Sequence, residues 1–253
     1  MIDTHCHLYT TAFKEDIDAV IKNATLAKVS KFYLPAIDSE HIESMLALSN
    51  KFPLQCFPMA GLHPCSVKEN FEEELEQVKT MLKKNKIYGI GETGLDFYWD
   101  KTFIPQQYKS LEMQIEFALE HNLPLILHTR NALQETIEVI KKYKHTELRG
   151  IFHCFGGSIE QAKEIIKTGF YMGIGGVLTY KNAGLAEVLK HIDMQHLVLE
   201  TDAPYLTPVP FRGKRNESSY LKYVAEKIAE VKNIDVEEVE NVTTFNAEKI
   251  FGV

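Results

Sequence analysis

Short apolar runs alternate with longer amphipathic segments along the 253 residues of the chain. The short runs are bounded by turn residues and most are rich in Ile, Val, Phe and Tyr, which is typical of β-strands. Eight such runs occupy residues 1–5, 31–37, 55–63, 86–92, 123–129, 149–154, 170–175 and 196–202. Between them, apolar residues recur three and four positions apart, as on one face of a helix. Ile17, Val20, Ile21 and Ala24 form one such face, and residues 217–251 contain two further helical patterns.

Eight strands that alternate with helices predict an α/β fold of the (β/α)8 TIM-barrel type. The alternative is a doubly wound open sheet, which has fewer strands and usually a glycine-rich first turn. The segment that follows the first run here is CHLYTTAF, which contains no glycine. No repeat, low-complexity tract or linker divides the sequence, so we expect a single domain over residues 1–253.

The composition is that of an ordinary globular enzyme, with 45% hydrophobic and 25% charged residues. No apolar run is long enough to cross a membrane, and no basic region followed by an apolar one indicates a secretory signal. Four cysteines without a CxxC pair are typical of free thiols in a reducing compartment. We therefore expect a cytoplasmic protein with no membrane contact and no obligate protein partner.

The formal net charge of −7 argues against a protein that coats nucleic acid non-specifically, because such proteins are usually basic. It does not argue against a nuclease, since bound cations can supply the positive charge at the site itself.

Histidines and carboxylates stand at the carboxyl ends of the predicted strands, which converge on the active-site face of a barrel. These residues are His5, His7, His63, Glu92, His128, His153, Glu200 and Asp202. Alternation along an extended chain places His5 and His7 on one side and Cys6 on the other, towards the helices. The same parity pairs Glu200 with Asp202.

This set of side chains indicates a metal centre. Imidazole and carboxylate together suit Zn²⁺, Mn²⁺, Fe²⁺, Co²⁺ or Ni²⁺. Four histidines and two carboxylates exceed what one four-coordinate ion needs, and they suit two ions that share a carboxylate and a water. A single histidine at a strand end is more often an ordinary polar residue, so the interpretation depends on the whole set.

Seven motifs occur in order between residues 2 and 220: IDTHCHL, GLHP, GIGETGLDFY, LPLILHTRNA, FHCFGGS, LVLETDAPYLTP and RGKRNESSY. Together they resemble the TatD family of metal-dependent hydrolases, within the amidohydrolase superfamily. The resemblance implies a TIM barrel with a DNase-type phosphodiesterase activity and two divalent ions. Mg²⁺ joins the candidate metals named above. The positions that match the family's metal ligands are His5, His7, Glu92, His128, His153 and Asp202, with Glu92 between the two ions.

The resemblance also implies that His63, Arg130 and Glu200 lie near the substrate. Arg212 and Lys214 in RGKRN are further candidates for phosphate contacts, with a solvated basic loop as the alternative. The sequence departs from the family pattern in two places. Cys65 replaces a second histidine that members often carry, which could weaken a substrate contact, and NESS replaces a proline-containing stretch in a loop.

The leading hypothesis is a phosphodiesterase that acts on DNA ends, in the manner of an exonuclease, with single-stranded DNA as substrate. Asp202 is expected to act as metal ligand and as proton acceptor for the attacking water, and Glu92 is the second catalytic carboxylate. Residues 97–99 (Phe-Tyr-Trp) could stack on bases or pack within their own loop. The alternatives are hydrolysis of a small ester, amide or phosphoester, and a non-catalytic metal-binding protein.

Overall fold

Eight parallel strands form the centre of the computed structural model, which describes residues 1–252. The strands are β1 (Ile2–Asp3), β2 (Lys31–Leu34), β3 (Cys56–Pro58), β4 (Ile90–Asp96), β5 (Leu125–Arg130), β6 (Gly150–Phe152), β7 (Tyr171–Ile174) and β8 (Leu197–Leu199). They pair in chain order as two sets, β1–β3 and β4–β8. Each of the eight predicted runs contains or overlaps one of these strands.

Two seams close the strands into a barrel. At one seam Ala60 forms a parallel bridge with Ile90, which joins the β3 segment to β4. At the other seam the backbone N–H of Thr4 donates to the carbonyl oxygen of Leu199 at 3.0 Å, which joins the β1 segment to β8. The predicted (β/α)8 barrel is thereby confirmed.

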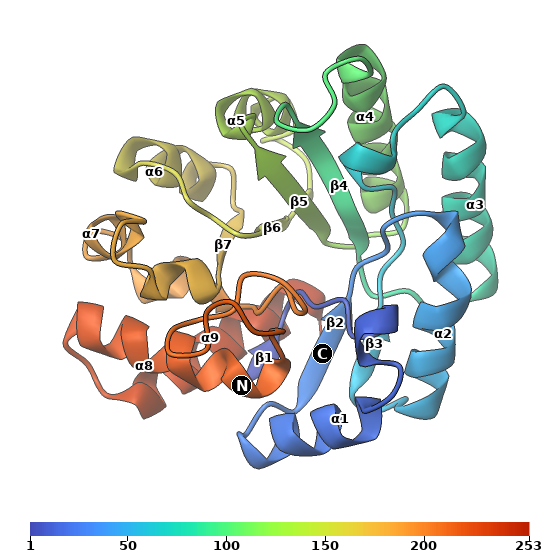
Figure 1. Ribbon diagram of the computed structural model, residues 1–253. Helices are drawn as coiled ribbons and strands as arrows, with labels where there is room; N and C mark the ends of the chain where they lie inside the picture. Colours follow the sequence, from blue (N-terminus) through green and yellow to red (C-terminus); the bar gives the residue numbers. More distant parts are fainter. Residues whose placement is uncertain (253) are drawn as a thin grey trace.

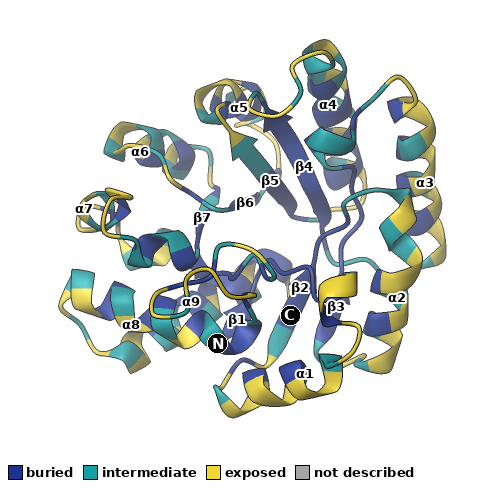
Figure 2. Ribbon diagram, in the orientation of Figure 1, coloured by how far each residue is buried: buried dark blue, intermediate teal, exposed yellow. Residues whose placement is uncertain are grey.

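Helices surround the barrel in chain order (Figure 1). They are α1 (Ile17–Leu26), α2 (Ile42–Lys51), α3 (Phe71–Lys84), α4 (Ile104–Glu120), α5 (Leu133–Lys141), α6 (Ile159–Lys167), α7 (Leu185–Leu189), α8 (Leu221–Lys232) and α9 (Val236–Phe251). Their inner faces and the strands are buried, while their outer faces are exposed (Figure 2). No helix within residues 1–252 is both long and apolar enough to cross a membrane.

Helix α9 also contributes apolar side chains to the core inside the barrel. Its residues Ala247, Ile250 and Phe251 belong to the same buried cluster as inward-facing strand residues such as Ile2 and Tyr33. The rings of Phe251 and Tyr33 stack with their centroids 3.5 Å apart. The helix therefore fills one end of the barrel with apolar side chains and leaves the opposite end for polar chemistry.

The boundaries of all eight strands differ from the predicted runs, and two of these differences change the setting of predicted ligands. Strand β4 extends to Asp96, so Glu92 lies inside the strand and not at its end. The reason is that Thr93–Asp96 continue to pair with β5 after a register shift between Ile90 and Thr93. Strand β1 ends at Asp3, and His5 and His7 follow it in irregular backbone that stays attached to both neighbouring strands.

Candidate metal centre

The Glu92 carboxylate is the centre around which five histidines gather. Its Oε2 atom lies 3.1 Å from Nε2 of His5 and 3.4 Å from Nε2 of His7. Its Oε1 atom faces the other three imidazoles: His128 Nδ1 at 2.8 Å, His153 Nε2 at 3.1 Å and His63 Nε2 at 3.3 Å. One carboxylate thus has a different group of histidines on each of its two oxygens.

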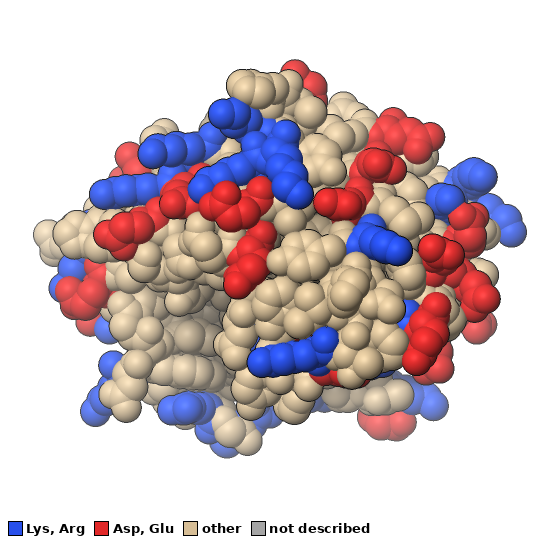
Figure 3. All heavy atoms as spheres, turned by 90° about the horizontal axis from the view of Figure 1, so that it is seen from above, with Lys and Arg blue, Asp and Glu red and all other residues tan. Residues whose placement is uncertain are grey.

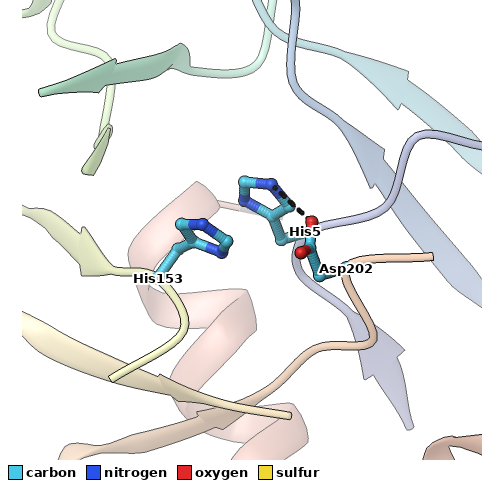
Figure 4. Close-up of side chains that lie close together, drawn as sticks. All are labelled: His5, His153 and Asp202. Carbon is cyan, nitrogen blue, oxygen red and sulfur yellow. Dashed lines mark ion pairs between the residues drawn. The ribbon is translucent and has the colours of Figure 1, made fainter. Parts of the chain in front are cut away.

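Asp202 completes the side occupied by the HxH pair. Its Oδ1 atom lies 3.6 Å from Nε2 of both His5 and His7. Figure 4 shows His5 between Asp202 and His153, and the rings of His5 and His153 stack with centroids 3.8 Å apart. Asp202 has a φ of 57°, a left-handed conformation that Asp tolerates better than most residues, and it follows the end of β8.

The protonation chemistry of this cluster fits metal cations. His5 Nε2 lies 3.3 Å from His7 Nε2, and His63 Nε2 lies 3.3 Å from His128 Nδ1, so at least one nitrogen of each pair must present a lone pair. Five imidazole nitrogens also exceed the roughly four lone-pair sites of a single carboxylate. Buried lone pairs that face carboxylates need positive charge between them, and a divalent ion supplies it.

Three groups of side chains in the described part of the chain could each hold a metal ion. They are His5–His153–Asp202, His5–His7–Glu92 and His63–Glu92–His128. Every residue predicted as a ligand from the sequence belongs to at least one of these groups, so the structure brings all six together. It adds His63, which was predicted to lie near the substrate and stands directly beside Glu92 and His128.

The charges within the cluster favour ionised carboxylates. Burial raises the pKa of the Glu92 carboxyl, but the surrounding histidines outweigh burial and hold that pKa well below its usual range. Burial and neighbouring histidines act in the same opposing way on Asp202, and its pKa is also lowered. Both carboxylates are therefore charged at neutral pH, as metal ligands must be.

Each of three histidines has a polar partner on the side of the ring that faces away from Glu92 or Asp202. For His7 the partner is the Tyr9 hydroxyl, and for His128 it is the Asp96 carboxylate at 3.0 Å from Nε2. For His153 it is the Glu200 carboxylate, which lies 3.3 Å from Nδ1 without a hydrogen bond to it. Such partners fix the orientation and tautomer of histidines that bind metals.

Glu200 lies behind His153 and is only 1% exposed. Its Oε1 atom also accepts the N–H of Cys154. A Cβ atom at Gly173 would lie 2.0 Å from the Glu200 carboxylate, so β7 needs glycine at this position to make room for that side chain. The placement differs from the predicted substrate contact because the side chain of Glu200 is directed towards β6 and β7 and not towards the opening.

Tyr9 and Asp96 are the partners that the sequence reasoning missed. Tyr9 follows His5 and His7 at the same spacing of two, and Asp96 lies four residues after Glu92. Alternation extended by one step from His7 reaches Tyr9, and by two steps from Glu92 it reaches Asp96. In β4 the later strand end also matters, because Asp96 is the last residue of the strand.

A cavity of about 710 Å³ opens over the cluster. His7, His63, Glu92, His128, His153 and Asp202 line it, together with Cys65, Asp96, Trp99, Arg130 and Tyr205. Glu200 and Arg212 are outside the lining that residues 1–252 provide. Arg212 is exposed and stacks on Tyr180, with its guanidinium carbon 4.3 Å from the ring centroid.

An aromatic wall stands at the edge of the cavity. We use this name for Tyr98 and Trp99, which are 50% and 66% exposed, whereas Phe97 packs against the core. The guanidinium carbon of Arg130 lies 4.0 Å from the ring centroid of Tyr98 and 5.0 Å from that of Trp99. The aromatic wall therefore offers exposed ring faces beside a positive charge.

Cys6 lies on the other side of the chain from the two histidines that flank it. It is fully buried in the main hydrophobic core, and its Sγ atom lies 3.7 Å from the carbonyl oxygen of Tyr33. This agrees with the parity that the sequence predicts for the HxH segment. Within the described residues all four cysteines are free thiols.

Comparison with known proteins places this arrangement in a family. The family model for TatD-related DNases matches residues 2–252. The chain belongs to the TatD-related DNase family. It is 39% identical over 254 residues to the uncharacterized metal-dependent hydrolase YabD of Bacillus subtilis, covering 100% of this chain and 99% of that protein. It is 32% identical to the uncharacterized metal-dependent hydrolase YcfH of Escherichia coli, covering 100% and 96%.

Solved structures agree with this membership in the TatD family. The crystal structure of YjjV, a TatD homologue from Escherichia coli, superposes with a TM-score of 0.94 at 29% identity, covering 100% of this chain and 98% of that one. A TatD-family hydrolase from Entamoeba histolytica superposes with a TM-score of 0.87 at 23% identity, covering 99% and 97%, and supports the shared fold. The resemblance that the seven motifs indicated is thereby confirmed, and the chain is a hydrolase of the TatD family.

Proposed function

We propose that this TatD-family hydrolase is a two-metal phosphodiesterase that removes nucleotides from the ends of single-stranded DNA. The observation that supports it most is the position of Glu92, whose two oxygens face separate groups of histidines at the base of a cavity. A shared carboxylate between two cations is the arrangement that in-line displacement at phosphorus uses.

The residues for the two ions divide between the two oxygens of Glu92. His5, His7 and Asp202 would hold one ion, and His128 and His153 the other, with Glu92 common to both. When bound, divalent ions at these positions supply Lewis acidity, which activates water at neutral pH and neutralises a phosphate group.

The protein side chains would orient the substrate and move the proton. Asp202, ionised and next to the HxH pair, would accept the proton of the attacking water at its carboxylate. Arg130, on the cavity edge, would donate to phosphate oxygens, for which its planar guanidinium is suited. His63, which lines the cavity beside His128, would contact the same phosphate.

The shape and charge of the protein favour a single strand or an end over a duplex. The chemistry lies at the base of a cavity of about 710 Å³, where a strand end can enter. The aromatic wall can stack on an unpaired base. On the side of the molecule in Figure 3, Lys and Arg side chains lie beside Asp and Glu side chains, which fits recognition within the cavity rather than on the outer surface.

A substrate panel tests the proposal. Single-stranded DNA, duplex DNA, a chromogenic phosphodiester, a carboxylic ester and an amide are each incubated with metal-loaded protein, with and without chelator. We expect chelator-sensitive release of nucleotides from single-stranded DNA to exceed every other activity. An ester or amide turned over faster than DNA would replace this proposal. The Glu92→Gln variant controls for contaminating nucleases, because it should lose the activity with the metal centre.

A further inference from the structure

Asp96 contacts two separate parts of the cavity with its two carboxylate oxygens. Oδ1 accepts the backbone N–H groups of Tyr98 at 2.9 Å and Trp99 at 3.0 Å. Oδ2 lies 3.0 Å from Nε2 of His128 and 3.4 Å from the Sγ of Cys65. One buried carboxylate therefore connects the aromatic wall to a histidine that contacts Glu92.

The backbone of Asp96 is held independently of its side chain. The side chain of Gln107 in α4 accepts the N–H of Asp96 at 2.9 Å and donates to its carbonyl oxygen at 3.2 Å. Both residues are buried, with exposures of 1% and 2%. The backbone at the end of β4 is thus held by α4. This fixes the position from which the Asp96 carboxylate contacts Tyr98, Trp99 and His128.

The contact with His128 determines which ring nitrogen carries the proton. A carboxylate accepts hydrogen bonds and does not donate them, so Nε2 of His128 must carry the hydrogen. The Nδ1 atom lies 2.8 Å from a second carboxylate oxygen, Glu92 Oε1, so it also carries hydrogen when no ion is bound. A metal ion at Nδ1 would need the lone pair there, and Asp96 would keep the remaining hydrogen on Nε2, as carboxylate partners of metal-binding histidines do.

We propose that Asp96 is a positioning residue that fixes the tautomer of His128 and, through its other oxygen, the height of the aromatic wall above the metal centre. The inference rests on the metal centre proposed above. As a consequence, a base stacked on Trp99 would hold the neighbouring phosphate of the same strand at a set distance from the metal centre. Asp96 itself touches neither substrate nor water in this assignment.

Two substitutions separate the two contacts. Asp96→Asn keeps an oxygen that can accept from Tyr98 and Trp99, but it presents an amide group to His128 that donates instead of accepting. Asp96→Ala removes both contacts. The matched control is Asp100→Asn. Asp100 lies in the loop that follows β4, pairs with Lys68 and contacts neither Glu92 nor His128.

Metal affinity is the first measurement. Apo protein is titrated with Zn²⁺ or Mn²⁺ in competition with a chromogenic chelator. We expect Asp96→Asn and Asp96→Ala to weaken the binding of one of the two ions by roughly 10–100-fold, the usual effect of removing such a partner. Asp100→Asn should bind both ions as the wild type does.

Fluorescence of the apo protein is the second measurement, because Trp99 is the only tryptophan of the chain. We expect its emission maximum and its quenching by acrylamide to be unchanged in Asp96→Asn and Asp100→Asn. In Asp96→Ala both should change, because the two N–H groups lose their acceptor.

Wild-type metal affinity in Asp96→Asn, or an unaltered Trp99 signal in folded Asp96→Ala, would overturn the coupling. The tautomer can also be read in the Zn²⁺-loaded wild type by long-range ¹H–¹⁵N NMR of the histidine rings, which needs no variant. A His128 ring that carries its hydrogen at Nδ1 and not at Nε2 in that state would overturn the proposal as well. Failure of the proposed function is distinguishable, because a wild-type protein that binds two ions but cleaves no DNA leaves these readouts intact.

Discussion

The Nδ1 atom of His7 lies 2.9 Å from the hydroxyl oxygen of Tyr9, and that hydroxyl donates its own hydrogen to the carbonyl oxygen of Pro35 at 2.6 Å. The Tyr9 hydroxyl can therefore only accept from His7, so Nδ1 of His7 carries a hydrogen and the other nitrogen, Nε2, faces Glu92 and Asp202. His7, Tyr9 and Pro35 are all buried, and this series of hydrogen bonds starts at the backbone carbonyl of Pro35. The fold thus leaves Nε2 as the nitrogen of this predicted ligand that can meet an ion.

The Tyr9→Phe variant should weaken metal binding on the His7 side while the protein remains folded. Without the hydroxyl, His7 can adopt either tautomer, so affinity for one ion should fall by roughly 10–100-fold. Chelator competition measures the affinity and circular dichroism verifies the fold. Unchanged affinity would show that the contact between His7 and Tyr9 has no part in metal binding.

The His128→Ala variant should lose one ion and keep the other. His5, His7 and Asp202 remain to hold an ion on the Oε2 side of Glu92, whereas the Oε1 side keeps only His153 and His63. Elemental analysis of the purified protein measures the metal content. His121→Ala, at an exposed position after α4, is the control. Full metal content in folded His128→Ala would contradict the two-ion assignment.

The Asp202→Asn variant should fold and bind an oligonucleotide, but its turnover should drop. Asparagine retains an oxygen of similar position and cannot accept the proton of the attacking water. Loss of a general base costs roughly 10²–10⁴-fold in rate. Single-turnover cleavage at verified metal content measures the effect, with exposed Asp235→Asn as control. If Asp202→Asn cleaves at nearly the wild-type rate, the proton goes elsewhere and Asp202 is not the general base.

The Cys6→Ala variant should keep its metal and lose only stability. The thiol is fully buried and faces Tyr33, away from the histidines on either side. Removal of the sulfur leaves a small cavity, which should lower the free energy of unfolding by about 1 kcal/mol. Cys56→Ala, a second buried thiol, should behave in the same way. A loss of metal in Cys6→Ala alone would contradict the side chain orientation.

The buried Asp3 carboxyl should make stability depend on pH. Burial raises its pKa to about 6, despite donors from Thr201 and Ser218. Because the folded pKa exceeds the unfolded value of 3.8, the folded state binds the proton more tightly. This contribution is fully present below pH 3.8 and is lost as pH rises through about 6.

Comparison of the wild type with Asp3→Asn isolates this contribution. Chemical denaturation of both apo proteins between pH 4 and pH 7 gives the difference in their free energies of unfolding. The wild type should lose stability relative to Asp3→Asn as pH rises across this interval, because the asparagine cannot ionise. A difference that stays constant with pH would mean that Asp3 keeps an ordinary pKa in the fold.

Periodicity alone determined the order of the elements and the sides of the chain on which Cys6 and its two neighbouring histidines stand. Spacing of two separated Cys6 from His5 and His7, and spacing of three and four found the inner faces of the helices. Both are local properties of backbone geometry, so they can be read from neighbouring residues. The convergence of strand ends in a barrel then predicted which residues would meet.

The tertiary structure decided which atoms face one another, because that depends on pairing between strands far apart in the sequence. The register shift in β4 moved Glu92 inside the strand and made Asp96 its last residue. Packing against Gly173 turned Glu200 towards His153 and away from the opening. The hydrogen-bond partners that fix the tautomers of His7 and His128 also follow from contacts in the folded chain, since a histidine has no tautomer preference that its own sequence position could encode.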